Sequence, residues 1–350
     1  MSKAVVFDNV SIVFGSDPKS ALPLMDEGKS RSEIQSETDQ VLGVHNCSIE
    51  VEEGEILVLM GLSGSGKSTL LRAVNGLNPV VRGSVSINDG SGMTNITSAD
   101  PAKLREMRLS RVAMVFQQFG LLPWRDVMEN VAFGLELGGM PKKQREEKAR
   151  EQLDLVGLSE WADRKVSELS GGMQQRVGLA RAFATEAPIL LMDEPFSALD
   201  PLIRSRLQDE LLELQANLKR TIIFVSHDLD EAFKLGGRIA IMEGGRIVQC
   251  GTPQDIIRNP ANEYVADFVA HMNPLGVLCA EDVMVDGELP EDAQAVTFDT
   301  SVAAIMDIFL SNDQPLRVMR EGAQIGVITP QSILAGFAGK PSVSEGAAPD

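Results

Sequence analysis

A short glycine-rich segment limits the folds open to this chain more than any other part of its sequence. Residues 61–69 read GLSGSGKST, follow the apolar run 56–60, and lead into TLLRAVNGL, which has helical character. Glycines let anionic oxygens approach bare backbone N–H groups, which a side chain would hold away. We therefore predict a buried strand, a phosphate-binding loop and a helix in direct succession.

The residue types in this loop suit a nucleoside triphosphate. Lys67 is expected to reach the β- and γ-phosphates, and the Ser68 hydroxyl is expected to bind Mg²⁺. A glycine-rich turn without a ligand is the alternative, and the flanking strand and helix argue against it. The predicted nucleotide-binding residues of the loop are Gly61, Leu62, Ser63, Gly64, Ser65, Gly66, Lys67, Ser68 and Thr69.

Two adjacent carboxylates, Asp193 and Glu194, follow the apolar run 189–192. Carboxylates at the end of a buried strand are costly unless a cation or a reaction uses them. We predict that Asp193 holds Mg²⁺, directly or through water. Successive strand residues point in opposite directions, so Glu194 is predicted to polarise the water that attacks the γ-phosphate. A purely structural acidic pair is the alternative.

Apolar runs alternate with helical segments along the chain, which predicts an α/β fold with a parallel core. Residues 119–170 turn helical and are predicted to form an inserted helical subdomain. The polar stretch 16–40 is predicted to be an exposed insertion without a catalytic role. The expected strands are 4–14, 47–51, 56–60, 112–116, 189–192, 221–225 and 239–242.

A second glycine motif, LSGGMQQR, occupies residues 169–176 and precedes the helical stretch GLARAFATE. Two glycines at a helix start present free N–H groups, which alone indicates only an anion-binding helix terminus. The phosphate loop, LSGGMQQR and MDEP occur here in one order, and that order resembles the nucleotide-binding subunits of ATP-binding-cassette (ABC) transporters. The resemblance implies an ABC-type P-loop ATPase with a RecA-like core.

The resemblance extends to three more motifs. Gln117 in VFQQ matches the family's Q-loop, where it would contact nucleotide and metal, and Asp200 in SALD matches the D-loop. His227 in FVSHD matches the switch histidine and, with Glu194, would be catalytic. Without the resemblance, His227 would be read as a core histidine. Phe14 is at the position of the aromatic residue that stacks on adenine. The implied cofactors are ATP and Mg²⁺.

The resemblance also implies that two copies of the chain face each other head to tail. Ser170, Gly171 and Gly172 of one copy would then close on ATP held by the other. His45 and His271 lie outside every motif and are predicted to be structural, as are the cysteines Cys47, Cys250 and Cys279, which we expect to be reduced.

Within the family, residues 1–272 resemble the importers of glycine betaine, proline betaine and choline. The segments MGLSGSGKSTLL, VFQQFGLLPWRDVMENVAFGLEL and LSGGMQQRVGLARA carry this likeness, together with Met173 in place of the usual glutamine and the long insertion. Overall likeness favours choline. The solute would be held by a transmembrane permease and a periplasmic or extracytoplasmic solute-binding protein, so no residue of this chain identifies it.

The net charge of −18 repels phosphate backbones, which argues against nucleic acid as a partner. No apolar run reaches the length of about 18 residues that spans a membrane. We therefore expect the chain at the cytoplasmic face of the inner membrane, bound through the permease. Residues 119–136 would receive the permease, with Trp124 and Phe133 as candidate contacts, although core packing explains them equally well.

The composition shifts after about residue 272. We predict a nucleotide-binding domain over 1–272, an α+β extension over 273–339 and a disordered tail over 340–350. LCAEDVM, TFDTSVAAIMDIFL and GVITPQSILAGF resemble part of a cystathionine-β-synthase (CBS) module, of which one shortened copy fits. An acidic tail that packs in a dimer is the alternative.

Two other classes of protein fit the sequence less well. Soluble ABC proteins that act on DNA or ribosomes resemble paired cassettes or cassettes split by coiled coils, whereas this chain has one unsplit, acidic cassette. A nucleotide-binding regulator without turnover would lack the catalytic carboxylate or the switch histidine, and this chain has both Glu194 and His227.

Overall fold

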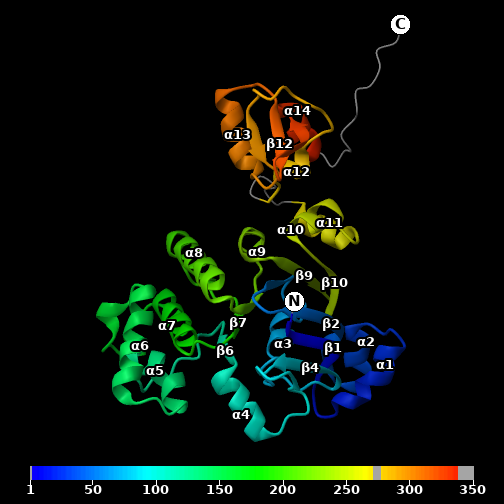
Figure 1. Cartoon of the computed structure of the whole chain (residues 1–350). Coiled ribbons are helices and arrows are strands. Elements are labelled where there is room, and N and C mark those ends of the chain that lie inside the picture. Colours follow the sequence, from blue (N-terminus) through cyan, green and yellow to red (C-terminus); the bar gives the residue numbers. More distant parts are fainter. Residues whose placement is uncertain (1, 271–276, 338–350) are drawn as a thin grey trace. The chain divides into compact units, whose positions relative to one another are not determined.

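The computed structural model describes residues 2–270 and 277–337 (Figure 1). The chain divides into two compact units, Met1–Cys250 and Gly251–Asp350. The boundary predicted near residue 273, the predicted tail 340–350 and His271 all lie outside the described residues. Among the described residues no helix has the length and apolar character needed to cross a bilayer.

The centre of the first unit is a six-stranded sheet in the order β10-β9-β3-β8-β7-β6. From β9 to β6 neighbouring strands pair in parallel, which confirms the predicted α/β core. Every residue of β3, β7 and β8 is buried, as in sheets covered on both faces. The strands are β3 (Ile56–Met60), β6 (Val112–Val115), β7 (Ile189–Asp193), β8 (Thr221–Val225), β9 (Arg238–Glu243) and β10 (Arg246–Gly251).

A second, antiparallel sheet has the strand order β2-β1-β4-β5. β1 ends at Phe14 as predicted, whereas β2 begins at Val41, earlier than the predicted start at Cys47. One apolar core joins this sheet to the six-stranded sheet, with Val5 and Val44 from one and Leu59 from the other. The strands are β1 (Lys3–Phe14), β2 (Val41–Glu52), β4 (Arg82–Asn88) and β5 (Met93–Asn95).

The polar insertion between β1 and β2 is folded. It forms a 3₁₀ turn η1 (Pro18–Ala21) and the helices α1 (Leu22–Asp26) and α2 (Arg31–Thr38), which lie beside β1 and β2 in Figure 1. It has its own apolar cluster, in which Ile34 is fully buried. The polar composition did not indicate this small core.

Three helices, α5 (Val127–Leu137), α6 (Lys142–Leu155) and α7 (Gly171–Ala184), pack against one another. The first two and the turns that follow them agree with the predicted helical subdomain over 119–170, and α7 completes the group. The other helices and turns of the first unit are α3 (Lys67–Leu71), α4 (Pro101–Ser110), η2 (Ser159–Trp161), η3 (Val166–Glu168), α8 (Pro201–Leu218) and α9 (Leu229–Leu235).

The second unit contains a three-stranded sheet in the order β11-β12-β13, with its first pair parallel and its second antiparallel. Buried apolar residues such as Ile305 and Val318 form its core. The extension is therefore α+β, and its likeness to a CBS module stays a prediction. Its elements are α10 (Pro253–Arg258), α11 (Glu263–Val269), α12 (Ala280–Val283), β11 (Ala295–Thr297), α13 (Val302–Ser311), β12 (Leu316–Arg320), β13 (Ala323–Ile328) and α14 (Pro330–Phe337).

Leu57 tests how much the parallel core contributes to stability, because it is fully buried in β3 between β8 and β9. Leu57→Ala should lower the free energy of unfolding of the first unit by about 2–5 kcal/mol through lost contacts and a cavity. Leu202→Ala is the control, since Leu202 is 80% exposed, and it should change stability by less than about 0.5 kcal/mol. Urea unfolding measures both, and equal losses would contradict the prediction.

Candidate functional site

The phosphate loop connects β3 to α3 and depends on glycine at two close approaches. A Cβ on Gly61, where φ is +138°, would lie 2.1 Å from the carbonyl oxygen of Met242. A Cβ on Gly66, where φ is +101°, would lie 2.7 Å from the carbonyl oxygen of Gly43. The loop is therefore wedged between β9 and β2, and no larger residue fits either position without shifting the backbone.

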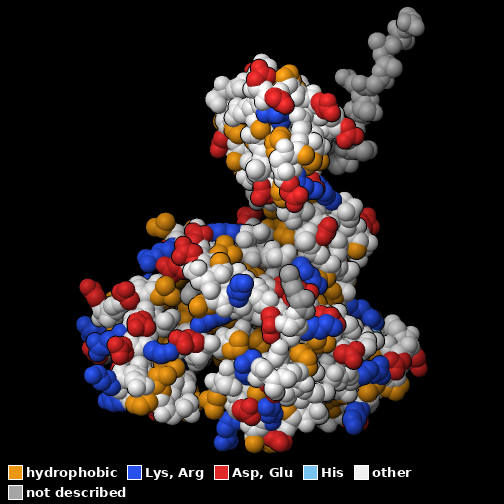
Figure 2. Space-filling view, viewed as in Figure 1, with side chains coloured by type: hydrophobic (Ala, Val, Ile, Leu, Met, Phe, Trp, Pro, Cys, Tyr) orange, Lys and Arg blue, Asp and Glu red, His pale blue; other side chains and the backbone are white. Residues whose placement is uncertain are grey.

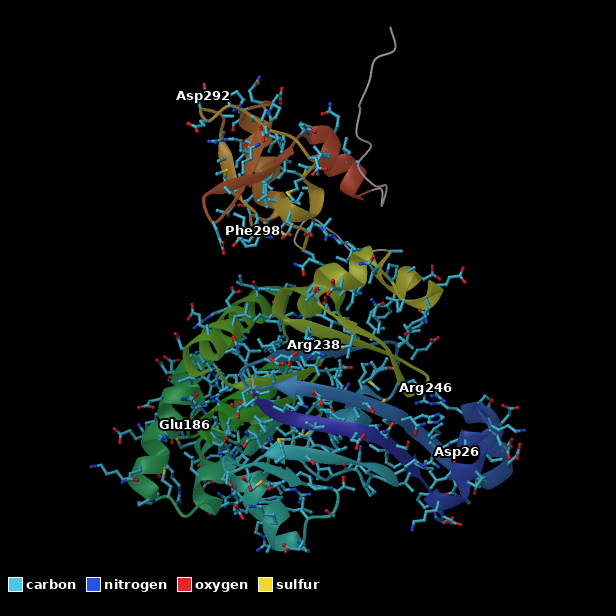
Figure 3. All side chains as sticks on the ribbon, turned by 45° about the vertical axis from the view of Figure 1, so that its right-hand side comes forward. Asp26, Glu186, Arg238, Arg246, Asp292 and Phe298 are labelled. Carbon is cyan, nitrogen blue, oxygen red and sulfur yellow. The ribbon has the colours of Figure 1, made fainter. Side chains whose placement is uncertain are left out.

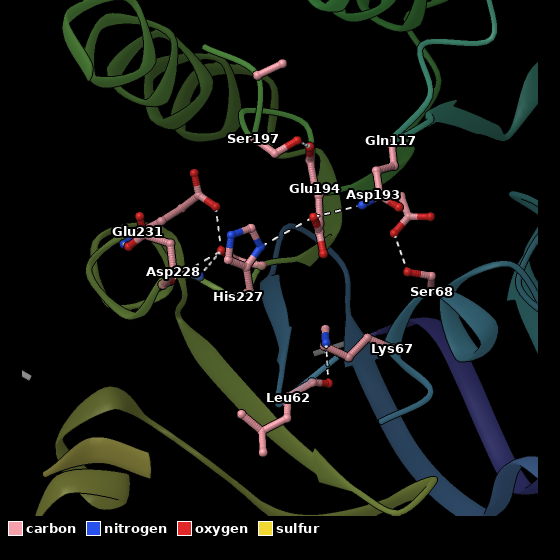
Figure 4. Close-up of polar contacts among 12 residues, drawn as sticks. Leu62, Lys67, Ser68, Gln117, Asp193, Glu194, Ser197, His227, Asp228 and Glu231 are labelled. Atoms are coloured by element: carbon pink, nitrogen blue, oxygen red, sulfur yellow. Dashed lines mark hydrogen bonds and ion pairs between the residues drawn. The ribbon is translucent and has the colours of Figure 1, made fainter. Parts of the chain in front are cut away.

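Lys67 is almost fully buried within the loop, at 6% exposure. Its Nζ donates hydrogen bonds to the carbonyl oxygens of Gly61, at 2.8 Å, and of Leu62, at 3.0 Å (Figure 4). Burial lowers the pKa of Lys67, and the charges of Glu194 and Asp193 act in the opposite direction. The ammonium group thus lies between the loop and the two carboxylates.

Asp193 ends β7 with a side chain that is 0% exposed. Its Oδ1 accepts a hydrogen bond from the Ser68 hydroxyl at 2.6 Å, and its Oδ2 pairs with Nη2 of Arg72 at 2.8 Å. A carboxylate beside a hydroxyl suits Mg²⁺, which takes one or two protein oxygens and completes its shell with water and phosphate oxygens. Arg72, one helical turn after Ser68, was not predicted as a site residue.

Glu194 has a left-handed backbone with φ of +47°, which is costly for a residue other than glycine and is typical of functional sites. Its Oε2 accepts a hydrogen bond from Nε2 of Gln117 at 3.0 Å and lies 3.4 Å from Nδ1 of His227 (Figure 4). Asp193 instead faces Ser68. The two carboxylates therefore face different partners, and because Glu194 follows β7 with a left-handed backbone, strand alternation does not set its direction.

A hydrogen-bonded group supports the segment that carries His227. Oε2 of Glu231 accepts from the Ser226 hydroxyl at 2.6 Å, and its Oε1 accepts from Nε2 of Gln208 at 3.1 Å. The backbone N–H of Asp228 donates to the Ser226 hydroxyl at 3.0 Å. Glu231 is 8% exposed, and burial raises its pKa. The sequence analysis did not identify Glu231, because this residue lies outside every recognised motif.

The second glycine motif begins α7, and Figure 1 shows α7 apart from α3 and the phosphate loop. The Ser170 hydroxyl caps the helix by accepting from the N–H of Met173 at 3.3 Å. The structure therefore does not bring Ser170, Gly171 and Gly172 onto the phosphate loop of the same chain. Asp200 caps α8, where its Oδ1 accepts from the N–H of Ile203 at 3.0 Å.

Gln175 joins α7 to the segment that follows β7 and was not predicted, although it lies inside LSGGMQQR. It is 1% exposed. Its Nε2 donates to the carbonyl oxygen of Glu194 at 3.2 Å, and its Oε1 accepts from the N–H of Ala198 at 3.0 Å. A buried amide that bonds at both ends fixes one segment against the other.

Phe14, at the end of β1, is 38% exposed. A Cβ on Gly43 would lie 2.8 Å from Cε2 of Phe14 and 3.1 Å from Cγ2 of Thr69. The ring therefore lies over Gly43, beside the last residue of the predicted phosphate-binding set. His45 is buried, and its Nε2 lies 3.3 Å from Nη2 of Arg246.

Known proteins share this combination of sequence and fold. A family model described as ABC transporter matches residues 44–197. The chain also resembles the ATP-binding cassette MJ0796, solved as a dimer in a post-hydrolysis state bound to ADP and Pi. The TM-score is 0.61 and the identity 30%, with coverage of 71% of this chain and 98% of that chain. The protein is an ATPase of the ABC class.

Two relatives indicate the branch of the ABC ATPases to which the chain belongs. The glycine betaine/proline betaine transport system ATP-binding protein ProV of Escherichia coli (strain K12) is 51% identical over 79% of this chain and 68% of its own length. The trimethylamine N-oxide transport system ATP-binding protein TmoW of Ruegeria pomeroyi is 42% identical over 93% of this chain and 94% of its own length. The chain belongs to the family of ABC ATP-binding subunits that contains the glycine betaine, proline betaine and choline import proteins.

The raised pKa of Glu231 predicts a pH dependence of stability. Between the ordinary carboxyl pKa and the raised one, the folded protein binds the proton that the unfolded chain releases, so this group's contribution to stability falls as pH rises. Glutamine does not titrate, so Glu231→Gln should not show this decrease in stability as pH rises. The melting temperature of the variant minus that of the wild type should therefore increase as pH rises from about 4 to about 8.

Glu147→Gln is the control for this measurement, because it removes one negative charge from an exposed position of α6. Calorimetry or circular dichroism across this pH range follows both variants. A difference for Glu231→Gln that stays constant or decreases with pH would contradict the assignment.

Proposed function

We propose that this chain binds Mg²⁺-ATP at the phosphate loop and hydrolyses it with Glu194 and His227. The observation that carries the proposal is the approach of Gln117 and His227 to one carboxylate oxygen of Glu194, next to Asp193 and Ser68. A carboxylate so placed can accept a proton from the attacking water and orient it. His227, whose side chain is 63% exposed, is free to contact the γ-phosphate.

The loop has groups suited to the phosphates. Among the described residues, the Lys67 ammonium bonds only to carbonyl oxygens of the loop, so it can turn to the β- and γ-phosphates without leaving a carboxylate unpaired. The Ser65 hydroxyl is buried and has no hydrogen-bond partner among the described residues, which leaves it for a ligand oxygen. Backbone N–H groups of residues 61–69 complete the cradle.

Mg²⁺, when bound, would neutralise charge that develops on the phosphate oxygens during transfer. Ser68 and Asp193 would hold it, because their oxygens already converge at 2.6 Å. Gln117 would be the third ligand. Its Nε2 faces Glu194, so the amide oxygen remains for the metal.

The nucleotide would be enclosed by two copies of the chain. Ser170, Gly171 and Gly172 form the start of α7, which lies apart from α3 in Figure 1, and this supports their contact with nucleotide held by a second copy. Asp200 would lie at the same interface. The dimeric state of the ADP-bound cassette of similar fold is consistent with this arrangement.

Phe14 is the proposed adenine platform. Its ring lies beside Thr69 and remains 38% exposed, so one face is open to stack on a base. The position at the end of β1, next to the phosphate loop, supports this role.

The partners we propose are transmembrane permease subunits, with a periplasmic or extracytoplasmic solute-binding protein reached through them. Trp124 is 71% exposed, which favours a contact with the permease. Phe133 is half-buried beneath the guanidinium of Arg125, 5.0 Å from the ring centroid, which favours packing. The protein would then act at the cytoplasmic face of the inner membrane.

Nucleic acid is not a proposed partner. Figure 2 shows acidic and basic side chains interspersed over the face in view, and the net charge is −18.

We propose that the second unit is a CBS-like regulatory or dimer-packing extension of the nucleotide-binding domain. Its α+β architecture is consistent with that class.

The solute we propose is a small quaternary amine with a fully substituted, positively charged nitrogen, such as choline, glycine betaine or proline betaine. Choline was predicted from overall likeness of sequence, and glycine betaine belongs to the same chemical class. Coverage favours trimethylamine N-oxide as a further candidate. The match to TmoW extends over 93% of this chain and therefore includes much of the second unit, whereas the match to ProV covers 79%.

Glu194→Gln tests the catalytic assignment. The amide keeps the shape of the side chain but cannot accept the proton, so kcat for ATP hydrolysis should fall about 10²–10⁴-fold while ATP binding is retained. Phosphate release and binding of a fluorescent nucleotide measure the two properties. Glu151→Gln, on the exposed face of α6, is the control. An unchanged kcat would remove Glu194 from the mechanism.

Uptake of labelled solutes tests the transport assignment. Cells carrying the chain with its permease and binding protein should accumulate choline, glycine betaine or trimethylamine N-oxide, and uptake should cease with Glu194→Gln. Uptake of one of the three alone would identify the solute within the proposed candidates. Lack of ATP-dependent uptake of all three would contradict the solute class and leave the ATPase assignment standing.

A further inference from the structure

The insertion between β1 and β2 reaches the phosphate loop through one side chain, Arg31. Its Nη1 donates a hydrogen bond to the carbonyl oxygen of Gly64 at 2.7 Å, and its Nη2 donates to the carbonyl oxygen of Gly43 at 2.5 Å. Gly64 belongs to the phosphate loop and Gly43 to β2. One guanidinium therefore bridges the loop and the neighbouring sheet.

Three features of the insertion fix the position of Arg31. Ser30 and Glu33 form a reciprocal capping box, so α2 starts at Arg31 with a fixed backbone. Ile34, one turn on, is fully buried in the small apolar cluster. Asp26, labelled on the insertion in Figure 3, forms an ion pair with Arg82 of β4. The bridge thus rests on a folded support.

The charge of Arg31 has no acidic partner among the described residues. The side chain is half-buried, and desolvation lowers its pKa, although a guanidinium stays protonated at neutral pH. Its Nε is buried and makes no hydrogen bond within the described part of the chain. Burial of a charge without a counter-charge is unfavourable, so a purely structural reason for this arginine is weak.

The two carbonyl oxygens belong to the two sides of the proposed ATP site. Gly64 lies on the phosphate side, whereas Gly43 is covered by the ring of Phe14 on the proposed adenine side. The loop is also held by the N–H of Gly245, which donates to the carbonyl oxygen of Ser65 at 3.1 Å. Of these two contacts from outside the loop, the one from Arg31 has a charged donor, and hydrogen bonds from a charged donor are the stronger ones.

We propose that Arg31 is a positioning residue that fixes the phosphate loop against β2 and thereby sets the affinity of the site for ATP. The inference rests on the proposed function of this site. A loop held in its binding shape before the ligand arrives loses less entropy on binding. Arg31 touches neither Glu194 nor His227 in the structure, so its effect lies in binding and not in the chemical step.

Arg31→Ala is the principal variant, and Lys29→Ala is its matched control. Lys29 belongs to the same insertion and carries the same charge, but it pairs with Glu37 at 3.6 Å, away from the loop. Arg31→Ala should raise both the KM for ATP and the Kd for a non-hydrolysable analogue about tenfold, with kcat within about twofold of wild type. Lys29→Ala should leave all three within about twofold of wild type.

Arg31→Lys separates the effect of the two-carbonyl geometry from the effect of the positive charge. It keeps the charge, but an ammonium cannot bond to both carbonyl oxygens as the planar guanidinium does. It should recover only part of the lost affinity, and the deficit of Arg31→Ala should persist at 1 M salt, where long-range attraction is screened. If Arg31→Ala is unstable, Arg31→Lys and Arg31→Gln, measured in the same way, decide the question.

Three results would overturn the proposal. They are equal effects of Arg31→Ala and Lys29→Ala, full recovery by lysine, or a fall in kcat with KM unchanged. Wild-type protein that neither binds nor hydrolyses ATP would instead refute the function on which the proposal rests, so the two failures are distinguishable.

Discussion

The buried carboxylate of Asp193 is the constraint on which the rest of the site depends. It is removed from water, so it requires a partner, and the Ser68 hydroxyl and Arg72 supply one each. Both come from the α3 segment, whereas Asp193 ends β7, two strands away from β3 in the sheet. Since parallel strands end at one edge, this contact fixes the phosphate loop relative to the strand that carries the carboxylates.

The loops around the site are held by charged donors on backbone carbonyl oxygens. Lys67 bonds to Gly61 and Leu62, and Arg31 bonds to Gly64 and Gly43. Arg181 of α7 bonds to Phe119 and Gly120, which follow Gln117 and Gln118 in the chain. Hydrogen bonds from these cationic side chains are stronger than bonds between neutral groups. The loop would be freed when the cation binds a stronger acceptor instead. In the proposed function, triphosphate oxygens would be such acceptors for Lys67, whereas Arg31 would keep its bonds to Gly64 and Gly43.

Much of this architecture follows from the sequence because buried parallel strands are continuous apolar runs. β3 and β8 have the predicted bounds, and β7 extends by one residue to Asp193. The insertion was less predictable, since its core needs only a few apolar residues, among them Ile34, within a polar segment. Arg31, Gln175 and Glu231 acquire their partners across the fold, so no local pattern identifies them. The second glycine motif was recognised by family likeness and not by geometry.

The strained backbone of Glu194 explains why so many contacts converge there. Its N–H donates to the carbonyl oxygen of Val225 at 3.1 Å, and its carbonyl oxygen accepts from Gln175 and from the Ser197 hydroxyl. These three bonds stabilise a left-handed conformation that a glutamate disfavours. Within the described part of the chain, the carboxylate itself is held by Gln117 and His227 alone. If nucleotide binds as proposed, a fixed backbone with an exchangeable carboxylate would let Glu194 change partners without reorganisation of β7.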